Sequence, residues 1–202
     1  AGIYAMITKN MVKSGDYLNL YFQDKDWLDK PHFPFWVTAA FFKVFGLTTW
    51  AYKLPGILFA LLGAVYTYLF TKQHYNKTTA LWATLMLLCS LHFLASNNDV
   101  RAEPFLTGMI IAAVYHFSNS LKSFFSWHLL AATAFTAMAM MTKGPFTLVT
   151  IGGALAGQLL IRQDWKQLFH PRWLLALVLL VIFISPELYS LWYHFDAHPD
   201  KT

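Results

Sequence analysis

Six long segments without a charged residue constrain this sequence more than any other feature. A helix needs roughly 20 apolar residues, within a range of about 17–25, to cross the hydrocarbon core of a bilayer. The segments therefore predict membrane-spanning helices, although the third is more polar and the sixth must continue past Glu187 to about Trp192. They are Leu54–Phe70, Thr78–Ser96, Pro104–Leu121, Ser123–Thr142, Gly144–Ile161 and Trp173–Pro186.

The composition agrees with a chain that is solvated mainly by lipid. Charged residues make up 12% of the sequence, about half the share that is typical of a soluble domain. The net charge of +5 does not indicate a nucleic-acid partner, because the basic residues are scattered among apolar segments and form no patch or stripe. Cys89 is the only cysteine, so a disulfide within the chain is excluded. No spacing of His or Cys residues indicates a metal site.

The loops on the two sides of the predicted bundle differ in charge. Short cytoplasmic loops favour Lys and Arg, whereas acidic residues count little toward orientation. We therefore expect the basic loops to face the cytoplasm and residues 1–53 to form an extracytoplasmic loop. The loops after the first, third and fifth segments carry one acid, Asp164, and the basic residues Lys72, Lys77, Lys122, Arg162, Lys166 and Arg172.

Residues 1–53 are predicted to contain interfacial helices. Residues 1–13 show an amphipathic helical pattern, and Ser14-Gly15-Asp16 is typical of a helix end. A second apolar stretch reaches Trp50 and is broken by Lys43 and Gly46. We expect it to lie along the membrane surface, because aromatic residues at the rim and a lysine in the middle suit the headgroup region.

The predicted fold is thus all-α: a polytopic transmembrane helix bundle of about six spans with interfacial amphipathic helices in its first extracytoplasmic loop. No linker divides the chain, so we expect one membrane-embedded domain over residues 1–202, with the bundle at 54–192. Both ends look cut, which indicates a piece of a longer protein. Close helix packing is expected at Gly152, Gly153 and Gly157, because small residues let membrane helices approach one another. Structural or interfacial roles are expected for the dispersed histidines His74, His92, His116, His128 and His170.

Polar residues gather in three places on the predicted extracytoplasmic face. Acids and bases brought to one rim could bind an anionic lipid headgroup and deprotonate an acceptor. Plainer interpretations stay open: a solvated loop, an ion pair that ends a helix, and a lysine that extends from a helix end toward water. The places are the run Asp24, Asp26, Asp29 and Lys30, the loop with Arg101 and Glu103, and the tight turn with Lys143.

Taken in order, these motifs resemble those of a known family. After the helix end at Ser14-Gly15-Asp16 come Asp29-Lys30-Pro31 with an aromatic run to Trp36, Phe45-Gly46-Leu47, Lys53-Leu54-Pro55, Arg101-Ala102-Glu103 and Thr142-Lys143-Gly144. The series is similar to the protein-O-mannosyltransferase-like branch of the GT-C membrane glycosyltransferases, which includes the bacterial aminoarabinose transferases that modify lipid A. The resemblance covers nearly the whole chain.

The resemblance implies roles for several residues. The principal catalytic Asp of the family would fall immediately before Ala1. Lys30 matches the lysine that contacts the carrier phosphate, and Glu103 matches a second acidic position that is often Asp in the family. Arg101 and Lys143 would assist in binding the phosphate. Asp29 stands where some relatives have a Glu near a metal, so a divalent metal stays open and no other cofactor is implied.

The implied activity is transfer of a sugar from a polyprenyl-phosphate donor to an acceptor hydroxyl on the extracytoplasmic face of a bacterial inner membrane. The acceptor could be lipid A, another glycan or a protein, and membrane lipids are the remaining expected partners. The fragment by itself is expected to be inactive. Two alternatives stay open: a transporter or flippase of lipid-linked or anionic solutes, and a non-catalytic subunit of a cell-envelope assembly. The transporter is disfavoured because transporters keep ionisable groups near the bilayer midplane.

Overall fold

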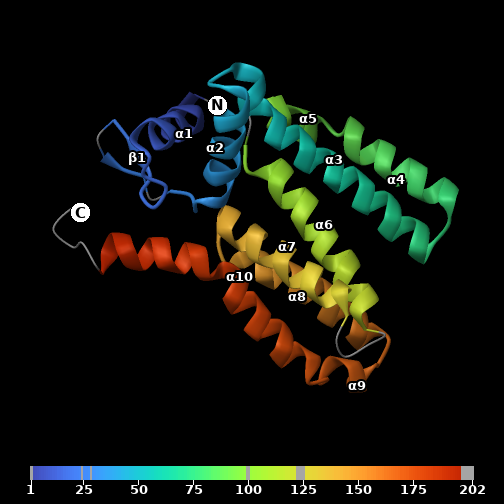
Figure 1. Ribbon diagram of the computed structural model, residues 1–202. Coiled ribbons are helices and arrows are strands. Elements are labelled where there is room, and N and C mark those ends of the chain that lie inside the picture. Colours follow the sequence, from blue (N-terminus) through green and yellow to red (C-terminus); the bar gives the residue numbers. More distant parts are fainter. Residues whose placement is uncertain (1, 24, 28, 99–100, 122–125, 197–202) are drawn as a thin grey trace.

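The computed structural model describes residues 2–23, 25–27, 29–98, 101–121 and 126–196, and within them it is almost entirely helical (Figure 1). The predicted all-α bundle is confirmed. Lys122 and Asp24, which entered the sequence predictions, lie outside the described residues. The elements are α1 (Gly2–Ser14), β1 (Tyr21–Phe22), β2 (Lys25–Asp26), α2 (Phe33–Phe45), α3 (Thr49–His74), α4 (Lys77–Cys89), α5 (Leu91–Asn98), α6 (Glu103–Ser120), α7 (Trp127–Lys143), α8 (Phe146–Ile161), α9 (Trp165–Leu168) and α10 (Arg172–Phe195).

The N-terminal part forms a small layer at one end of the bundle (Figure 1). Helix α1 ends where predicted, because Gly15 takes a left-handed φ of 74° that most residues avoid. Strands β1 and β2 form a short antiparallel hairpin between α1 and α2. Helix α2 has 13 residues and is about 20 Å long at 1.5 Å per residue. It is therefore too short to cross a hydrocarbon core of about 30 Å, as an interfacial helix should be.

Each of the six uncharged segments forms a helix or a bent pair of helices in the bundle. Among the described residues, two helices are long and apolar enough to cross a membrane: α3, and the continuous segment Trp165–Phe195. Helices α4 and α5 meet at 56° and would make a third span if they act as one. Helices α6, α7 and α8 have 16 to 18 residues. At 1.5 Å per residue they reach about 24–27 Å, slightly less than the thickness of the core.

Much of the bundle surface is apolar and uncovered. In the most apolar windows of the two long spans, only 28% and 22% of the residues are buried inside the chain. The exposed side chains on α10 include Leu174, Val178, Val181 and Ile182. Such a surface would be costly in water, so it suits contact with lipid tails or with further membrane helices.

Two glycines bring α3 and α6 into close contact. A Cβ atom added at Gly108 would lie 2.4 Å from the carbonyl oxygen of Phe59, and one at Gly63 would lie 3.4 Å from the backbone of Gly108. The prediction for the other glycines is wrong within this chain. A Cβ at Gly152, Gly153 or Gly157 would meet no atom within 4 Å, so none of the described helices makes a close approach at these positions.

The end of the bundle with the basic loops is held together by polar contacts between helix ends. The guanidinium of Arg172 donates to the carbonyl oxygen of Ser120 at 2.6 Å, and the amides of Gln73 and Asn119 pair at 3.0 and 3.1 Å. Two histidines from different helices, α6 and α7, also contact each other near this end. The Nδ1 atoms of His116 and His128 lie 2.8 Å apart, so these two are hydrogen-bonded partners and not dispersed residues.

Candidate functional site

The predicted polar residues come together at the opposite end of the bundle. There α6 begins, α7 ends, and α1 lies beside the loop that precedes α2 (Figure 1). The contacts described below place Asp29, Lys30, Arg101, Glu103 and Lys143 around one region at this end. Residues that lie more than 100 positions apart in the sequence therefore share a single polar site.

Glu103 and Lys143 form an ion pair that joins α6 to α7. The ammonium Nζ of Lys143 donates to Oε1 of Glu103 at 3.1 Å. Glu103 is the first residue of α6 and Lys143 is the last residue of α7, so each charge also complements the dipole of its own helix. The two side chains are 31% and 35% exposed, which leaves both accessible to a ligand.

The Glu103 carboxylate is stabilised as an anion. Partial burial acts to raise its pKa, but the hydrogen bond with its own backbone, the hydrogen bond and charge of Lys143, and the charge of Arg101 together hold the pKa below its usual value. Glu103 is therefore ionised at neutral pH. In that form it can accept a proton or orient a hydroxyl, but it is a weak base unless a ligand changes its surroundings.

Lys30 and Asp29 form a second ion pair, in the loop before α2. The ammonium Nζ of Lys30 lies 3.0 Å from Oδ2 of Asp29 and also donates to the Asp29 carbonyl oxygen at 3.2 Å. The Lys30 side chain is only 24% exposed, whereas that of Asp29 is 59% exposed. An incoming anion would compete with Asp29 for the lysine, and the exposed carboxylate could then turn toward solvent.

Tyr4 on α1 lies near both pairs, and nothing in the sequence distinguishes it from the other residues of an amphipathic helix. Its hydroxyl lies within electrostatic range of Lys30, Asp29, Glu103 and Arg101. Burial is the main cause that raises its pKa, so the phenol keeps its proton at neutral pH and can donate a hydrogen bond. The Tyr4 ring packs edge-on against Phe35, with centroids 5.3 Å apart, which fixes its position.

Arg101 approaches the same place from the start of α6. It lines a narrow crevice with Tyr4, Thr8 and Phe105, and its backbone N–H donates to the carbonyl oxygen of Ser96 at 3.1 Å. The crevice separates α1 from the bundle. Arg101 and Lys30 are therefore two cations near Tyr4, and Lys143 is joined to the same region through Glu103.

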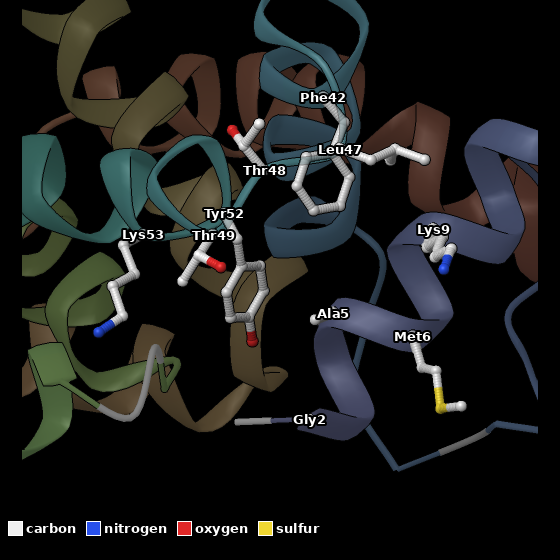
Figure 2. Close-up of a pocket in the computed structure, with 10 residues that line it drawn as sticks. All are labelled: Gly2, Ala5, Met6, Lys9, Phe42, Leu47, Thr48, Thr49, Tyr52 and Lys53. Atoms are coloured by element: carbon white, nitrogen blue, oxygen red, sulfur yellow. The ribbon is translucent and has the colours of Figure 1, made fainter.

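A larger groove opens on the other side of α1. Its volume is about 440 Å³, and Figure 2 shows the Tyr52 ring in the gap between α1 and α3, with Lys9 and Lys53 on opposite sides. The lining contains no acidic residue. The groove is lined by Gly2, Ala5, Met6, Lys9, Phe42, Leu47, Thr48, Thr49, Tyr52 and Lys53.

A second polar cluster joins the loop between α1 and α2 to α10, and the sequence did not predict it. His32 bonds to Glu187 with 3.0 Å between Nδ1 and Oε1, and Nδ1 of His194 lies 2.6 Å from Oδ1 of Asn19. The sequence carried one signal: Glu187 is an acid inside an otherwise apolar segment, which is costly in a membrane unless it has a partner. Among the described residues, no three His, Cys, Asp or Glu side chains gather as metal ligands would.

Comparison with known proteins gives a consistent result. A family model described as "Dolichyl-phosphate-mannose-protein mannosyltransferase" matches residues 29–190. An uncharacterized protein of Aquifex aeolicus (strain VF5) is 30% identical over 163 residues, which cover 79% of this chain and 32% of the relative. An undecaprenyl phosphate-alpha-4-amino-4-deoxy-L-arabinose arabinosyl transferase of Yersinia pestis (strain Pestoides F) is 29% identical over 70% of this chain and 26% of its own length.

Two solved structures share the fold. The crystal structure of ArnT from Cupriavidus metallidurans in the apo state matches 98% of this chain and 37% of its own, with a TM-score of 0.83 and 22% identity. The same protein bound to undecaprenyl phosphate matches with a TM-score of 0.81 and 21% identity, over 96% of this chain. The chain thus spans about a third of the length of the relatives that it matches.

Proposed function

The chain belongs to the dolichyl-phosphate-mannose-protein mannosyltransferase family of GT-C glycosyltransferases, and from this premise we propose that the full-length protein transfers a sugar from a polyprenyl-phosphate carrier to an acceptor hydroxyl. The observation that carries the proposal is the meeting of three cations, two carboxylates and a phenol at one end of the bundle. The acceptor is lipid A, another glycan or a protein, and transfer takes place on the extracytoplasmic side of the inner membrane.

Lys30, Arg101 and Lys143 are proposed to bind the phosphate of the carrier. In the transfer the bond between the anomeric carbon and the phosphate oxygen breaks, and polyprenyl phosphate leaves with the extra negative charge. Cations held in place before the reaction stabilise that charge without reorganisation, which is often the largest contribution to catalysis. The Tyr4 hydroxyl can donate a further hydrogen bond to the phosphate because its raised pKa keeps it protonated.

An acidic side chain would take the proton of the attacking hydroxyl. The acceptor oxygen forms the new bond to the anomeric carbon, and direct displacement inverts that centre. The principal base is proposed to be the Asp expected before Ala1, four residues ahead of Tyr4. Glu103 is proposed to act as the second carboxylate. Asp29 is proposed to offset part of the positive charge of Lys30 through their ion pair.

The groove beside α1 is proposed to hold part of a lipid ligand. Its lining is largely carbon, which suits an acyl or isoprenyl chain, and the ammonium groups of Lys9 and Lys53 suit an anionic head (Figure 2). The groove shares Tyr52 with the crevice that contains Tyr4 and Arg101. A ligand in it would therefore lie close to the proposed reaction centre.

The transporter alternative makes a different prediction for the same lipid. A transporter moves a labelled polyprenyl-phosphate sugar across the membrane without consuming it, whereas an enzyme releases polyprenyl phosphate, and a non-catalytic subunit does neither. The charged groups of the site lie at a bundle end, and Glu187, in the part of the sixth span that continues to about Trp192, is paired with His32 of the loop before α2. This distribution favours an enzyme.

The proposal is tested by replacing the central cation in the full-length protein. Lys30→Met should lower transfer from labelled undecaprenyl-phosphate sugar by roughly 100–1000-fold, the cost typical of losing one donor to a developing anion. Lys77→Met, at the start of α4 on the opposite end, is the matched control and should transfer normally. Wild-type turnover by Lys30→Met would remove the phosphate site from the proposal.

A further inference from the structure

A buried carboxylate on α10 holds the residue that follows Lys30 by two positions. Oε2 of Glu187 accepts a hydrogen bond from the backbone N–H of His32 at 3.2 Å, and Oε1 lies 3.0 Å from Nδ1 of the same residue. The side chains of His32 and Glu187 are 9% and 7% exposed. One side chain therefore fixes both the backbone and the ring of His32, across 155 positions of sequence.

The hydrogen bonds limit where the protons of His32 and Glu187 can lie. Nε2 of His32 is 3.0 Å from the carbonyl oxygen of Leu18, which can only accept, so Nε2 carries a proton. One more proton lies between Nδ1 and Glu187, either on the imidazolium or on the carboxylic acid. The pair is neutral overall in both forms, and each polar atom that faces its partner is satisfied, as burial requires.

The shape of α10 brings Glu187 to this position. Pro186 cannot donate to the carbonyl oxygen of Ile182, and the Ser185 hydroxyl donates to that oxygen instead, at 2.7 Å. Helix α10 changes direction near its middle, and its last turns run toward the N-terminal layer (Figure 1). Because Glu187 immediately follows Pro186, it is the first polar group that the redirected helix presents to the loop.

A second contact two turns further along α10 holds the other part of the same loop. His194 lies seven positions after Glu187 and so on the same helix face. Its Nδ1 is 2.6 Å from Oδ1 of Asn19, and its Nε2 is 3.6 Å from Oδ2 of Asp26. The loop from Asp16 to His32 is thus fixed to α10 at two points, while α1 and the bundle hold the other side of the site.

From these contacts we infer that Glu187 is a positioning residue: by holding His32, it fixes the place of the Lys30 ammonium group. Pro31 is the only residue between Lys30 and His32, and its ring restricts the backbone there. Fixing His32 therefore limits where the ammonium of Lys30 can lie. Glu187 does not touch the phosphate. The inference rests on the proposed function, in which Lys30 binds that phosphate. Misplacing such a group by about 1 Å can lower the rate of a reaction by about 100-fold.

The hydrogen-bond pattern predicts an unusual order of variants at this position. In Glu187→Gln the amide oxygen can still accept from the His32 N–H, and the amide N–H can donate to Nδ1 of a neutral imidazole. Glu187→Asp keeps the carboxyl group but shortens the side chain by a methylene, so it draws His32 away from its position. Glu187→Ala removes both contacts. The amide of equal length should therefore outperform the shorter acid.

The test measures equilibrium binding of labelled undecaprenyl phosphate to the full-length protein in detergent, with melting temperatures recorded for each variant. Glu187→Gln should bind within about 3-fold of wild type, whereas Glu187→Asp and Glu187→Ala should bind more than about 10-fold more weakly. Ser190→Ala, a buried position one turn further along α10, is the matched control and should bind normally. In a Lys30→Met background Glu187→Asp should weaken binding no further, because coupled residues are not additive.

The outcomes separate this inference from the proposed function. If Lys30→Met binds undecaprenyl phosphate as wild type does, the phosphate site itself is wrong. Two results would overturn the positioning role and leave the phosphate site in place. In the first, Lys30→Met binds weakly but Glu187→Asp binds as wild type does. In the second, Glu187→Asp weakens binding further in the Lys30→Met background. Because Glu187→Asp retains a carboxylate, it keeps the test decisive even if Glu187→Ala does not fold.

Discussion

The two ends of the bundle use their charges in different ways. At the end with α1 and α2, acids and bases come from separate parts of the chain and pair with one another, as in the contacts of Lys143 with Glu103 and of Lys30 with Asp29. At the other end, the basic residues lie in or beside the ends of the helices, and these ends are joined by contacts such as that of the Arg172 guanidinium with the Ser120 carbonyl oxygen.

The difference separates charges that set orientation from charges that could bind a ligand. Lysines and arginines in short loops act on topology one by one and need no fixed neighbours. A site that recognises phosphate needs several groups held in one geometry, and holding them costs additional structure. Here that structure is the hairpin β1–β2, the bent helix α10 and the packed α1. At the basic end, the contacts among the described residues join helix ends to one another, as Arg172 does with Ser120 and Gln73 with Asn119.

The largest expected effect tests whether the two ends face opposite sides of the membrane. With Cys89 replaced by Ser, Lys25→Cys in β2 should react with a membrane-impermeant maleimide in intact cells. Lys77→Cys at the start of α4 should react only after the membrane is permeabilised. Both positions are exposed in the structure, so access and not burial decides the result. Labelling of both from the same side would make the proposed orientation wrong.

The next effect separates pairing from catalysis at the polar end. Glu103→Ala should lower transfer by roughly 100-fold, as is typical for loss of a general base or of a charged group at a reaction centre. Combining Glu103→Lys with Lys143→Glu should restore the ion pair but only part of the melting temperature, because each exchanged charge then opposes the dipole of its own helix. It should not restore transfer, because the carboxylate would then project from α7 and not from α6.

Recovery of transfer in the exchanged variant would instead mean that the pair only joins α6 to α7. The measurement is initial rate with labelled donor, alongside thermal unfolding of the same preparations. This result would support the plainer interpretation of Arg101 and Glu103 as residues that end a helix, and the polar end would then resemble the basic end in using charge for structure alone.

The sequence predicted most of the fold because membrane spans have a strong local signal. Absence of charge over a segment of suitable length is sufficient to find α3, α6, α7 and α8, and Gly15, Gly46 and Gly144 mark helix ends through left-handed φ angles. Packing was less predictable. The close contact lies at Gly63 and Gly108 and not in the glycine-rich α8, because which helices adjoin is not encoded by the small residues alone.

The site was only partly predictable for the same reason. Motifs identified Lys30, Glu103 and Lys143, whose charges stand out in an apolar sequence, and their roles stay predictions. Tyr4 and His32 were missed because each resembles its neighbours: Tyr4 is one aromatic residue on an apolar stripe, and His32 follows a proline in an aromatic run. Their importance depends on partners 155 or about 100 positions away, which only the tertiary fold brings close.

The smallest expected effect is a difference in acid sensitivity between the two ends. Glu103 has a lowered pKa in the folded state, so its contribution to stability is present above the ordinary Glu pKa and is lost as pH falls through the lowered folded value. Because Glu103 and Lys143 are each about one-third exposed, the contribution should be less than about 1 kcal/mol.

The melting temperature of wild type should therefore exceed that of Glu103→Gln at pH 7, and the gap should close as the pH falls below the ordinary Glu value. A control without an acid, Lys77→Met at the basic end, should stay parallel to wild type throughout. A gap for Glu103→Gln that is constant with pH would mean that the carboxylate is not stabilised as an anion by its neighbours, and the electrostatic distinction between the two ends would fail at its central residue.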